Sequence, residues 1–191
     1  MDITAISALI KKRRSIFPPM YNEVEISKET IEQVLENANY APTHKLTEPW
    51  RFKILRGPAR GRLAAFLVEQ YKLLTPLEQQ TEKKLKKMAE NPLLSNCVIA
   101  ICMKRHQDIV PEWEEIAAVA MAVQNMWLTC TSLGIGSYWS TPAAIERLDE
   151  PLGLAHDERC LGLFYMGYSD VVLPERKRNP IADKVEWIED I

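Results

Sequence analysis

Residues 113–133 constrain the fold of this chain more than any other stretch. Their apolar side chains recur at helical spacing and lie almost all round the predicted helix: Ile116, Ala117, Val119, Ala120, Val123, Met126 and Trp127. Gly134 follows, as is common just beyond a helix C-terminus. A helix that is apolar on all sides must be buried, so we expect it to be the central helix of the domain and also part of a subunit interface.

The other segments predict a mixed α+β domain. Residues 97–103 form a continuous apolar run of strand length, which is typical of a central strand covered on both faces. A second buried strand is predicted over residues 160–168, and a half-buried strand around Phe52 and Ile54. With 191 residues and no flexible linker, we expect one domain spanning residues 1–191.

Helices are predicted between these strands. The first covers residues 3–12, and the second runs to Asn39 after a capping residue, Ser27. A third follows Gly57 and Pro58, and a charged helical cover that could act as a lid is expected over residues 78–90. We expect a short helix to begin at Pro142.

Composition excludes several classes of partner. The 24 basic and 26 acidic residues give a net charge of −2, which argues against nucleic acid or an anionic membrane. The longest apolar run is far shorter than the ~20 residues that span a bilayer. Four cysteines without a CxxC pair suit free, buried thiols in a reducing compartment, so we expect a cytoplasmic protein. The three histidines lie far apart without an HExxH motif, so no metal is expected.

The loop of residues 41–52 is rich in hydrogen-bonding groups. Pro42 and Pro49 stiffen it and favour an extended backbone at the residues before them, Ala41 and Glu48. Thr43, His44, Lys45 and Glu48 lie between the prolines or next to them. Such a loop fits the binding of a polar, planar ligand.

Two basic segments each allow two interpretations. Residues 11–14 read Lys-Lys-Arg-Arg and precede Ser15, so they either end a helix with favourable charge or form a fork for a phosphate. Residues 174–180 contain Arg176, Lys177 and Arg178, and are either a solvated tail or an anion site. The sequence leaves both pairs of alternatives open.

No familiar catalytic set is present. There is no Walker loop and no GxSxG motif, and Gly134-Ile135-Gly136 follows a helix rather than a strand, which excludes a Rossmann fingerprint. Glu112, Glu114 and Glu115 are interpreted as complementing a helix dipole. This pattern favours chemistry that a cofactor carries.

Five motifs in order resemble the FMN-dependent NAD(P)H nitroreductase family, and within it the small nitroreductases that carry a histidine in the central loop. The motifs are Arg13-Arg14-Ser15, Ala41-Pro42-Thr43-His44-Lys45, Pro49-Trp50-Arg51-Phe52, Gly134-Ile135-Gly136 with Trp139, and Met166-Gly167-Tyr168. The resemblance implies an α+β fold with a central, mostly antiparallel sheet flanked by helices. It also implies an intertwined homodimer whose long helices pack across the two-fold axis, with FMN bound between the subunits.

The resemblance also implies roles for particular residues. Arg13, Arg14, Ser15 and Arg178 would hold the FMN phosphate end, and Tyr40 and His44 would reach the flavin of the other subunit. Trp139, Ser140 and Thr141 would lie along the flavin ring, and the nicotinamide nucleotide would bind near Leu133 and Gly134. No protein side chain is expected to act as a catalytic acid, base or nucleophile.

The implied activity passes a hydride from NAD(P)H through FMN N5 to a nitroaromatic, a quinone or a similar acceptor by a ping-pong mechanism. Alternatives within the fold are dehalogenation, enoyl-type reduction or flavin breakdown. A protein that only carries or senses FMN, and a helix-rich interaction protein without a cofactor, are alternatives of other classes.

Three positions depart from the family pattern. Leu46 and Glu48 occupy positions where many relatives have amides, and Phe17 occupies the position of a cation near flavin N1. Because a positive charge there stabilises the reduced flavin, we expect either a lower flavin potential or compensation by Lys45 or Arg14.

Overall fold

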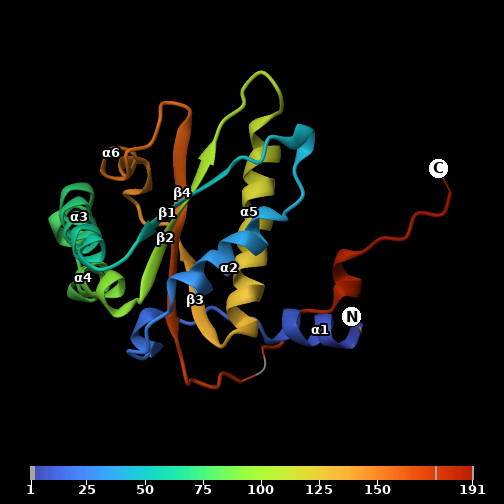
Figure 1. The fold of residues 1–191 in the computed structure, drawn as a ribbon, viewed down its shortest axis with the longest axis horizontal. Helices are drawn as coiled ribbons and strands as arrows, with labels where there is room; N and C mark the ends of the chain where they lie inside the picture. Colours follow the sequence, from blue (N-terminus) through green and yellow to red (C-terminus); the bar gives the residue numbers. More distant parts are fainter. Residues whose placement is uncertain (1–2, 175, 191) are drawn as a thin grey trace.

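A four-stranded antiparallel sheet forms the centre of the computed structural model, which describes residues 3–174 and 176–190 (Figure 1). The strand order is β1-β2-β4-β3, and every neighbouring pair is antiparallel. The strands are β1 (Trp50–Leu55), β2 (Cys97–Lys104), β3 (Ile135–Ser140) and β4 (Glu158–Tyr168). This architecture confirms the predicted α+β class.

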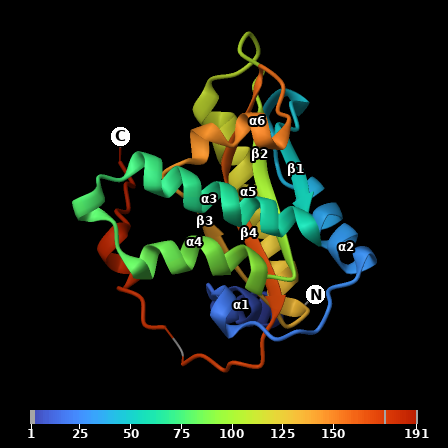
Figure 2. The same ribbon diagram turned by 90° about the vertical axis from the view of Figure 1, so that its left-hand side faces the viewer.

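Helices cover both faces of the sheet. The helices are α1 (Ile3–Lys12), α2 (Lys28–Asn39), α3 (Pro58–Leu74), α4 (Glu82–Leu94), α5 (Glu112–Ser132) and the short α6 (Asp149–Leu152). Helices α2 and α5 lie on one face, and α3 and α4 lie side by side on the other (Figures 1 and 2). No helix in residues 3–174 and 176–190 is both long enough and apolar enough to cross a bilayer.

Strand β2 joins two hydrophobic clusters. Its alternate residues Cys97, Ile99, Ile101 and Met103 pack with α2 and α5. The residues between them, Val98, Ala100 and Cys102, pack with Leu63 and Leu67 of α3. Because side chains alternate across a strand, this continuous apolar run fills both layers of the core, as the sequence predicts. All four cysteines are buried and unpaired.

Local signals place the helix ends correctly. The hydroxyl of Ser27 accepts a hydrogen bond of 3.1 Å from the backbone N–H of Thr30 and caps α2. Pro58 occupies the first turn of α3. The charged helix predicted over residues 78–90 is α4, which begins later and packs against α3, on the sheet face away from α5.

Three local features differ from the predictions. No strand was predicted at residues 137–140, but they belong to β3, an edge strand whose neighbour in the sheet is β4. The short helix expected at Pro142 is a 3₁₀ turn, Ile145–Arg147, followed by α6. Glu48 is not extended, because its φ is +41°. The glycine and serines of β3 weaken the strand signal, and pairing with β4 overrides them.

Helix α5 is not buried on all sides within one chain. Ala118, Val119, Ala122, Val123 and Met126 are buried against the sheet and α2. Its opposite side is exposed: Trp113 is 68% exposed, and Ile116 and Met121, which follow it along the helix, are exposed as well. The prediction of a central core helix is therefore confirmed, and an apolar stripe is left for another partner.

Candidate functional site

The two arginines that follow α1, Arg13 and Arg14, have different partners. Arg14 folds back, and its guanidinium donates to the carbonyls of Lys11 at 2.6 Å and Arg13 at 3.0 Å. Arg13 points the other way, with its guanidinium carbon 4.7 Å from the ring centroid of Trp127 on α5. Arg14 therefore ends the helix, as the first interpretation predicts, whereas the phosphate fork stays a prediction for Arg13, which is stacked on an aromatic face.

Arg13 lines a cavity of about 870 Å³ whose walls carry several cationic side chains. Its lining residues are Ile10, Lys11, Arg13, Arg14, Ser15, Gln124, Trp127, Arg176, Lys177 and Arg178. Burial lowers the pKa of Arg13, and the nearby charges of Arg178, Arg14 and Arg176 lower this pKa further. None of the described lining residues is acidic, so an anion bound here would relieve the repulsion. This geometry favours an anion site over a solvated tail for residues 176–178.

Residues 14–16 are tied to α5 and to the free edge of β3. The indole N–H of Trp127 donates to the carbonyl of Arg14 at 3.2 Å, and the N–H of Ile16 donates to the carbonyl of Ser137 at 3.1 Å. An edge strand presents backbone groups of alternate residues on its open side. Trp139, two residues beyond Ser137, therefore presents its backbone on the same open side of β3.

The ring of Trp139 is held by close packing. Its indole N–H donates to the carbonyl of Leu161 at 3.3 Å, and the ring lies against Gly162, where an added Cβ would come within 1.8 Å of Nε1. Phe164, its partner in the β3–β4 register, meets the ring of Trp127 edge-on at 5.6 Å between centroids. Trp127 and Trp139 therefore flank Phe164 on the α5 face of the sheet.

Ser140 and Thr141 do not join this group. They line a separate, smaller cavity with α3 and α4, on the opposite face of the sheet from Trp139. The alternation of side chains along β3 separates Ser140 from Trp139. Residues 139–141 are thus contiguous in sequence, but the side chain of Trp139 lies on the α5 face of the sheet and those of Ser140 and Thr141 lie on the α3 and α4 face.

The loop that carries His44 is tightly fixed. Lys45, Leu46 and Glu48 all have positive φ, at 55°, 53° and 41°. The hydroxyl of Thr43 accepts from the N–H of Glu48 at 3.2 Å, and Nδ1 of His44 lies 2.5 Å from Oε2 of Glu114 in the first turn of α5. Backbone strain of this kind concentrates where a loop must hold one shape.

The predicted residues form two groups within one chain. Arg13, Ser15 and Arg178 meet near Trp127, whereas His44 is anchored at Glu114, thirteen residues earlier on α5. Thirteen residues of helix correspond to about 20 Å along the axis. Tyr40, 78% exposed, is in the same loop region as His44, at the end of α2. A single chain does not bring Tyr40 and His44 to the cationic cavity.

The remaining predicted positions lie around the end of α5. Gly134 lines a third cavity, of about 530 Å³, together with Lys11, Lys12 and Arg14, and Leu133 is exposed beside it. The ring of Phe17 packs against that of Tyr138, with 4.9 Å between the centroids and a tilt of 57° between the ring planes. The expected effect of Phe17 on flavin potential stays a prediction.

Sequence reasoning missed three contributors to these groups. Trp127 was assigned only to the apolar core, Gln124 was not singled out, and Glu114 was assigned only to the helix dipole. One signal for Trp127 was available, because a large aromatic residue with a polar N–H needs a partner when it is half-buried. The partner of Glu114 comes from a loop seventy residues away, and no local pattern marks it.

An antiparallel sheet between two helical layers, with a cationic cavity beside a free strand edge, describes an α+β protein suited to a phosphorylated, planar ligand. The sequence profile of the Nitroreductase family matches residues 10–168. The chain belongs to the nitroreductase family.

Individual relatives and solved structures support this family membership. YfhC of Bacillus subtilis, provisionally named an NAD(P)H nitroreductase, is 27% identical over 180 residues, covering 92% of this chain and 90% of YfhC. The crystal structure of a nitroreductase-like family protein from Bacillus cereus superposes with a TM-score of 0.85 at 26% identity, covering 100% of this chain and 99% of that one. The FMN-dependent nitroreductase NfnB from Mycobacterium smegmatis, solved with NADPH, gives a TM-score of 0.76 at 20% identity and covers 97% and 99%.

Proposed function

We propose that the protein is an FMN-dependent oxidoreductase that passes electrons from NAD(P)H to a small acceptor such as a nitroaromatic or a quinone. The observation that carries this proposal is the cationic cavity with Arg13 stacked on Trp127, next to the open edge of β3. Membership of the nitroreductase family supports it, as does the description of NfnB as FMN-dependent and bound to NADPH. The four unpaired cysteines and the use of NAD(P)H favour a cytoplasmic location.

The described residues fit FMN in charge and shape. Arg13, Ser15 and Arg178 would hold the phosphate, because guanidinium groups bind phosphate oxygens with paired hydrogen bonds. Arg14 supports the same end while it caps α1. The backbone of Trp139 would donate to the ring edge from the open side of β3. When bound, the flavin supplies the hydride chemistry, while the protein positions it and excludes water.

We propose that two copies complete the two sites. The exposed apolar stripe of α5 fits a two-fold interface in which two α5 helices run antiparallel. That arrangement would offset the separation of about 20 Å between His44 and Arg13, because the His44 end of one helix would meet the Arg13 end of the other. The C-terminal segment extends away from the body and exposes Trp187, so it would reach over the second copy (Figure 1).

Changing Met121 to glutamate tests this dimer. A buried charge without a partner is strongly unfavourable, so we expect the wild-type protein to sediment as a dimer and Met121→Glu to sediment as a monomer with little bound FMN. Analytical ultracentrifugation measures both. Leu73→Glu is the matched control, because Leu73 is exposed on α3 away from the stripe. A wild-type monomer that binds FMN would refute the shared sites.

The activity is tested by absorption spectroscopy of the purified protein under anaerobic conditions. We expect a flavin spectrum that bleaches on addition of NADPH or NADH and recovers on addition of a nitroaromatic or quinone. Parallel lines in double-reciprocal plots would support the ping-pong order. A flavin that stays oxidised with both nucleotides would identify a carrier or sensor, and product analysis would separate dehalogenation, enoyl-type reduction and flavin breakdown.

Measuring FMN affinity by absorption spectroscopy tests whether the cationic cavity holds the FMN phosphate. Arg13→Ala should weaken FMN binding roughly 10- to 100-fold, the usual effect of losing a hydrogen bond to a charged group. Lys12→Ala is the control, because Lys12 is the neighbouring cation and does not line this cavity. Equal FMN affinity of the two variants would place the phosphate elsewhere.

A further inference from the structure

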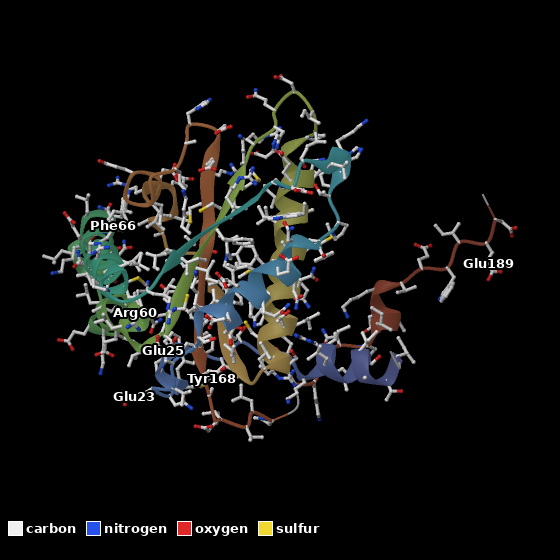
Figure 3. The ribbon with its side chains drawn as sticks, viewed as in Figure 1. Glu23, Glu25, Arg60, Phe66, Tyr168 and Glu189 are labelled. Carbon is white, nitrogen blue, oxygen red and sulfur yellow. The ribbon has the colours of Figure 1, made fainter. Side chains whose placement is uncertain are left out.

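The first turn of α5 makes a contact that has no role in the function proposed so far. Nδ1 of His44 lies 2.5 Å from Oε2 of Glu114, although the two residues are seventy positions apart in the sequence. An ionised carboxylate only accepts hydrogen bonds, so the imidazole donates Nδ1–H to it. The loop of residues 43–48 is thereby bound to the start of α5, at the opposite end of that helix from α1 (Figures 1 and 3).

The backbone of this loop is strained. Lys45, Leu46 and Glu48 each carry a Cβ, yet all three have positive φ values between 41° and 55°. Residues other than glycine avoid this region, because the Cβ is crowded there. Such conformations persist only where the surrounding structure enforces them, and they concentrate at active sites and ligand clamps. The strain therefore indicates that the loop must hold one particular shape.

Most of the bonds that hold this shape are internal to the loop. The hydroxyl of Thr43 pairs with that of Thr47 at 3.0 Å and accepts from the N–H of Glu48 at 3.2 Å. In the part of the chain that the structure describes, the bond to Glu114 is the one side-chain hydrogen bond that ties residues 43–48 to an element other than the adjoining β1. Glu114 therefore fixes the strained loop relative to α5.

The second ring nitrogen of His44 remains available to a ligand. The side chain is 58% exposed, and none of residues 3–174 and 176–190 forms a hydrogen bond to Nε2. Because Nδ1–H is donated to the carboxylate, the neutral ring presents Nε2 as a hydrogen-bond acceptor. Glu114 thus selects both the direction of the ring and its tautomer.

This His44–Glu114 pair lies at the edge of the exposed apolar stripe of α5. Trp113 directly precedes Glu114 and is largely exposed, and Leu46 of the same loop is exposed as well. In the dimer proposed above, this end of one α5 meets the Arg13 end of the other. The free nitrogen of His44 would then lie close to the cationic cavity of the second copy.

We propose that Glu114 is a positioning residue for the flavin site of the second copy. It holds the ring of His44 through Nδ1 and directs Nε2 toward the FMN that the other subunit binds at Arg13. This role of Glu114 rests on the proposed function, because it requires FMN in the cationic cavity and a dimer with shared sites. Glu114 acts through His44 and does not itself contact the flavin.

Nitrogen-15 NMR of the imidazole ring in the protein as purified tests the positioning step. We expect the neutral ring of His44 to carry its proton on Nδ1 in the wild type and in Glu114→Gln, because the amide oxygen still accepts. Glu114→Ala should lose this preference. Glu112→Ala is the matched control, because Glu112 also lies in the first turn of α5 but pairs with Arg159. An unchanged tautomer in Glu114→Ala would overturn the proposal.

FMN titration tests whether the pair acts on the flavin site. His44→Ala and Glu114→Ala should each weaken FMN binding roughly 2- to 10-fold, the usual effect of losing one hydrogen bond. The double variant should bind FMN no more weakly than His44→Ala, because the two residues act as one unit. Glu114→Gln should retain most of the affinity. Additive losses, or an equal loss in Glu112→Ala, would show that Glu114 does not act through His44.

Mixed dimers test whether the effect crosses the two-fold axis. A dimer of one Arg13→Ala subunit and one Glu114→Ala subunit, isolated through two different affinity tags, would contain one site that is damaged twice and one that is intact. We therefore expect it to bind one FMN with wild-type affinity. If Glu114 acted on the site of its own chain, both sites would be damaged once, and neither would bind FMN with that affinity.

The two proposals fail in different ways. A wild-type protein that binds no FMN would overturn the proposed function and this role of Glu114 with it. If the wild type binds FMN and its flavin bleaches with NADPH or NADH, while Glu114→Ala binds FMN equally tightly, the proposed function stands and only the role of Glu114 is refuted.

Discussion

Replacing Glu115 with alanine should lower the free energy of unfolding by about 3 to 5 kcal/mol, the usual cost of removing one partner of a buried ion pair. Glu115 is 1% exposed. Its carboxylate accepts from the guanidinium of Arg105, from the backbone N–H of His106 at 3.0 Å and from Nδ1 of His106 at 2.7 Å. The alanine variant leaves all three groups without this acceptor in a half-buried loop.

Urea denaturation measures the effect, with Glu112→Ala as the control. Glu112 lies one turn earlier on α5 and pairs with Arg159 at 3.0 Å, but both side chains are nearly half exposed. An exposed ion pair contributes about 0.2 to 1 kcal/mol, so the control should lose at most that much. Similar losses of unfolding free energy in the two variants would mean that Glu115 does not stabilise the loop that carries Arg105 and His106.

The contribution of Glu115 should depend on pH in a definite direction. Burial raises the pKa of Glu115, but hydrogen bonds from His106 and Arg105 lower it more, so the net pKa lies below its ordinary value. A carboxyl whose folded-state pKa is depressed stabilises the fold above its unfolded pKa, near 4.3, and loses that effect as the pH falls through the folded pKa. The difference in the free energy of unfolding between wild type and Glu115→Ala should therefore be constant near neutral pH and become smaller in acid.

Glu115 also shows what the sequence could not predict. Glu112, Glu114 and Glu115 all lie in the first turn of α5, where each complements the helix dipole. They differ in burial and in their partners, which are Arg159 for Glu112, His44 for Glu114 and the Arg105–His106 pair for Glu115. Those partners come from three other segments of the chain, so the distinction depends on tertiary structure.

The predictable parts of the fold are those with a local cause. The apolar run of β2, the amphipathic pattern of α2 and its Ser27 cap each specify structure within a few residues. Strand β3 lacks such a signal, because it consists partly of glycine and serine and is stabilised by its register with β4. The same limit applies to the candidate site. The sequence indicated a cation fork at residues 13–15, but the direction of Arg13 depends on where α1 meets Trp127.

Replacing Gly162 with alanine should disturb stability and flavin binding together. An added Cβ would lie 1.8 Å from Nε1 of Trp139 and 2.5 Å from its Cδ1, so the indole must move and lose its bond to Leu161. Overpacking of a core typically costs about 1 to 3 kcal/mol. Because Trp139 lies where the flavin ring is proposed to bind, FMN affinity should fall as well.

Gly61→Ala is the matched control, because Gly61 lies within α3 and an added Cβ would have nothing within 4 Å. Alanine is favoured over glycine inside a helix, so this variant should be unchanged or more stable by up to about 1 kcal/mol. Denaturation and FMN titration on both variants separate two outcomes. If Gly162→Ala loses stability but keeps its FMN affinity, Trp139 is a core residue and the flavin ring does not depend on it. If both quantities fall while Gly61→Ala retains both, the close approach of Trp139 to Gly162 shapes the flavin site.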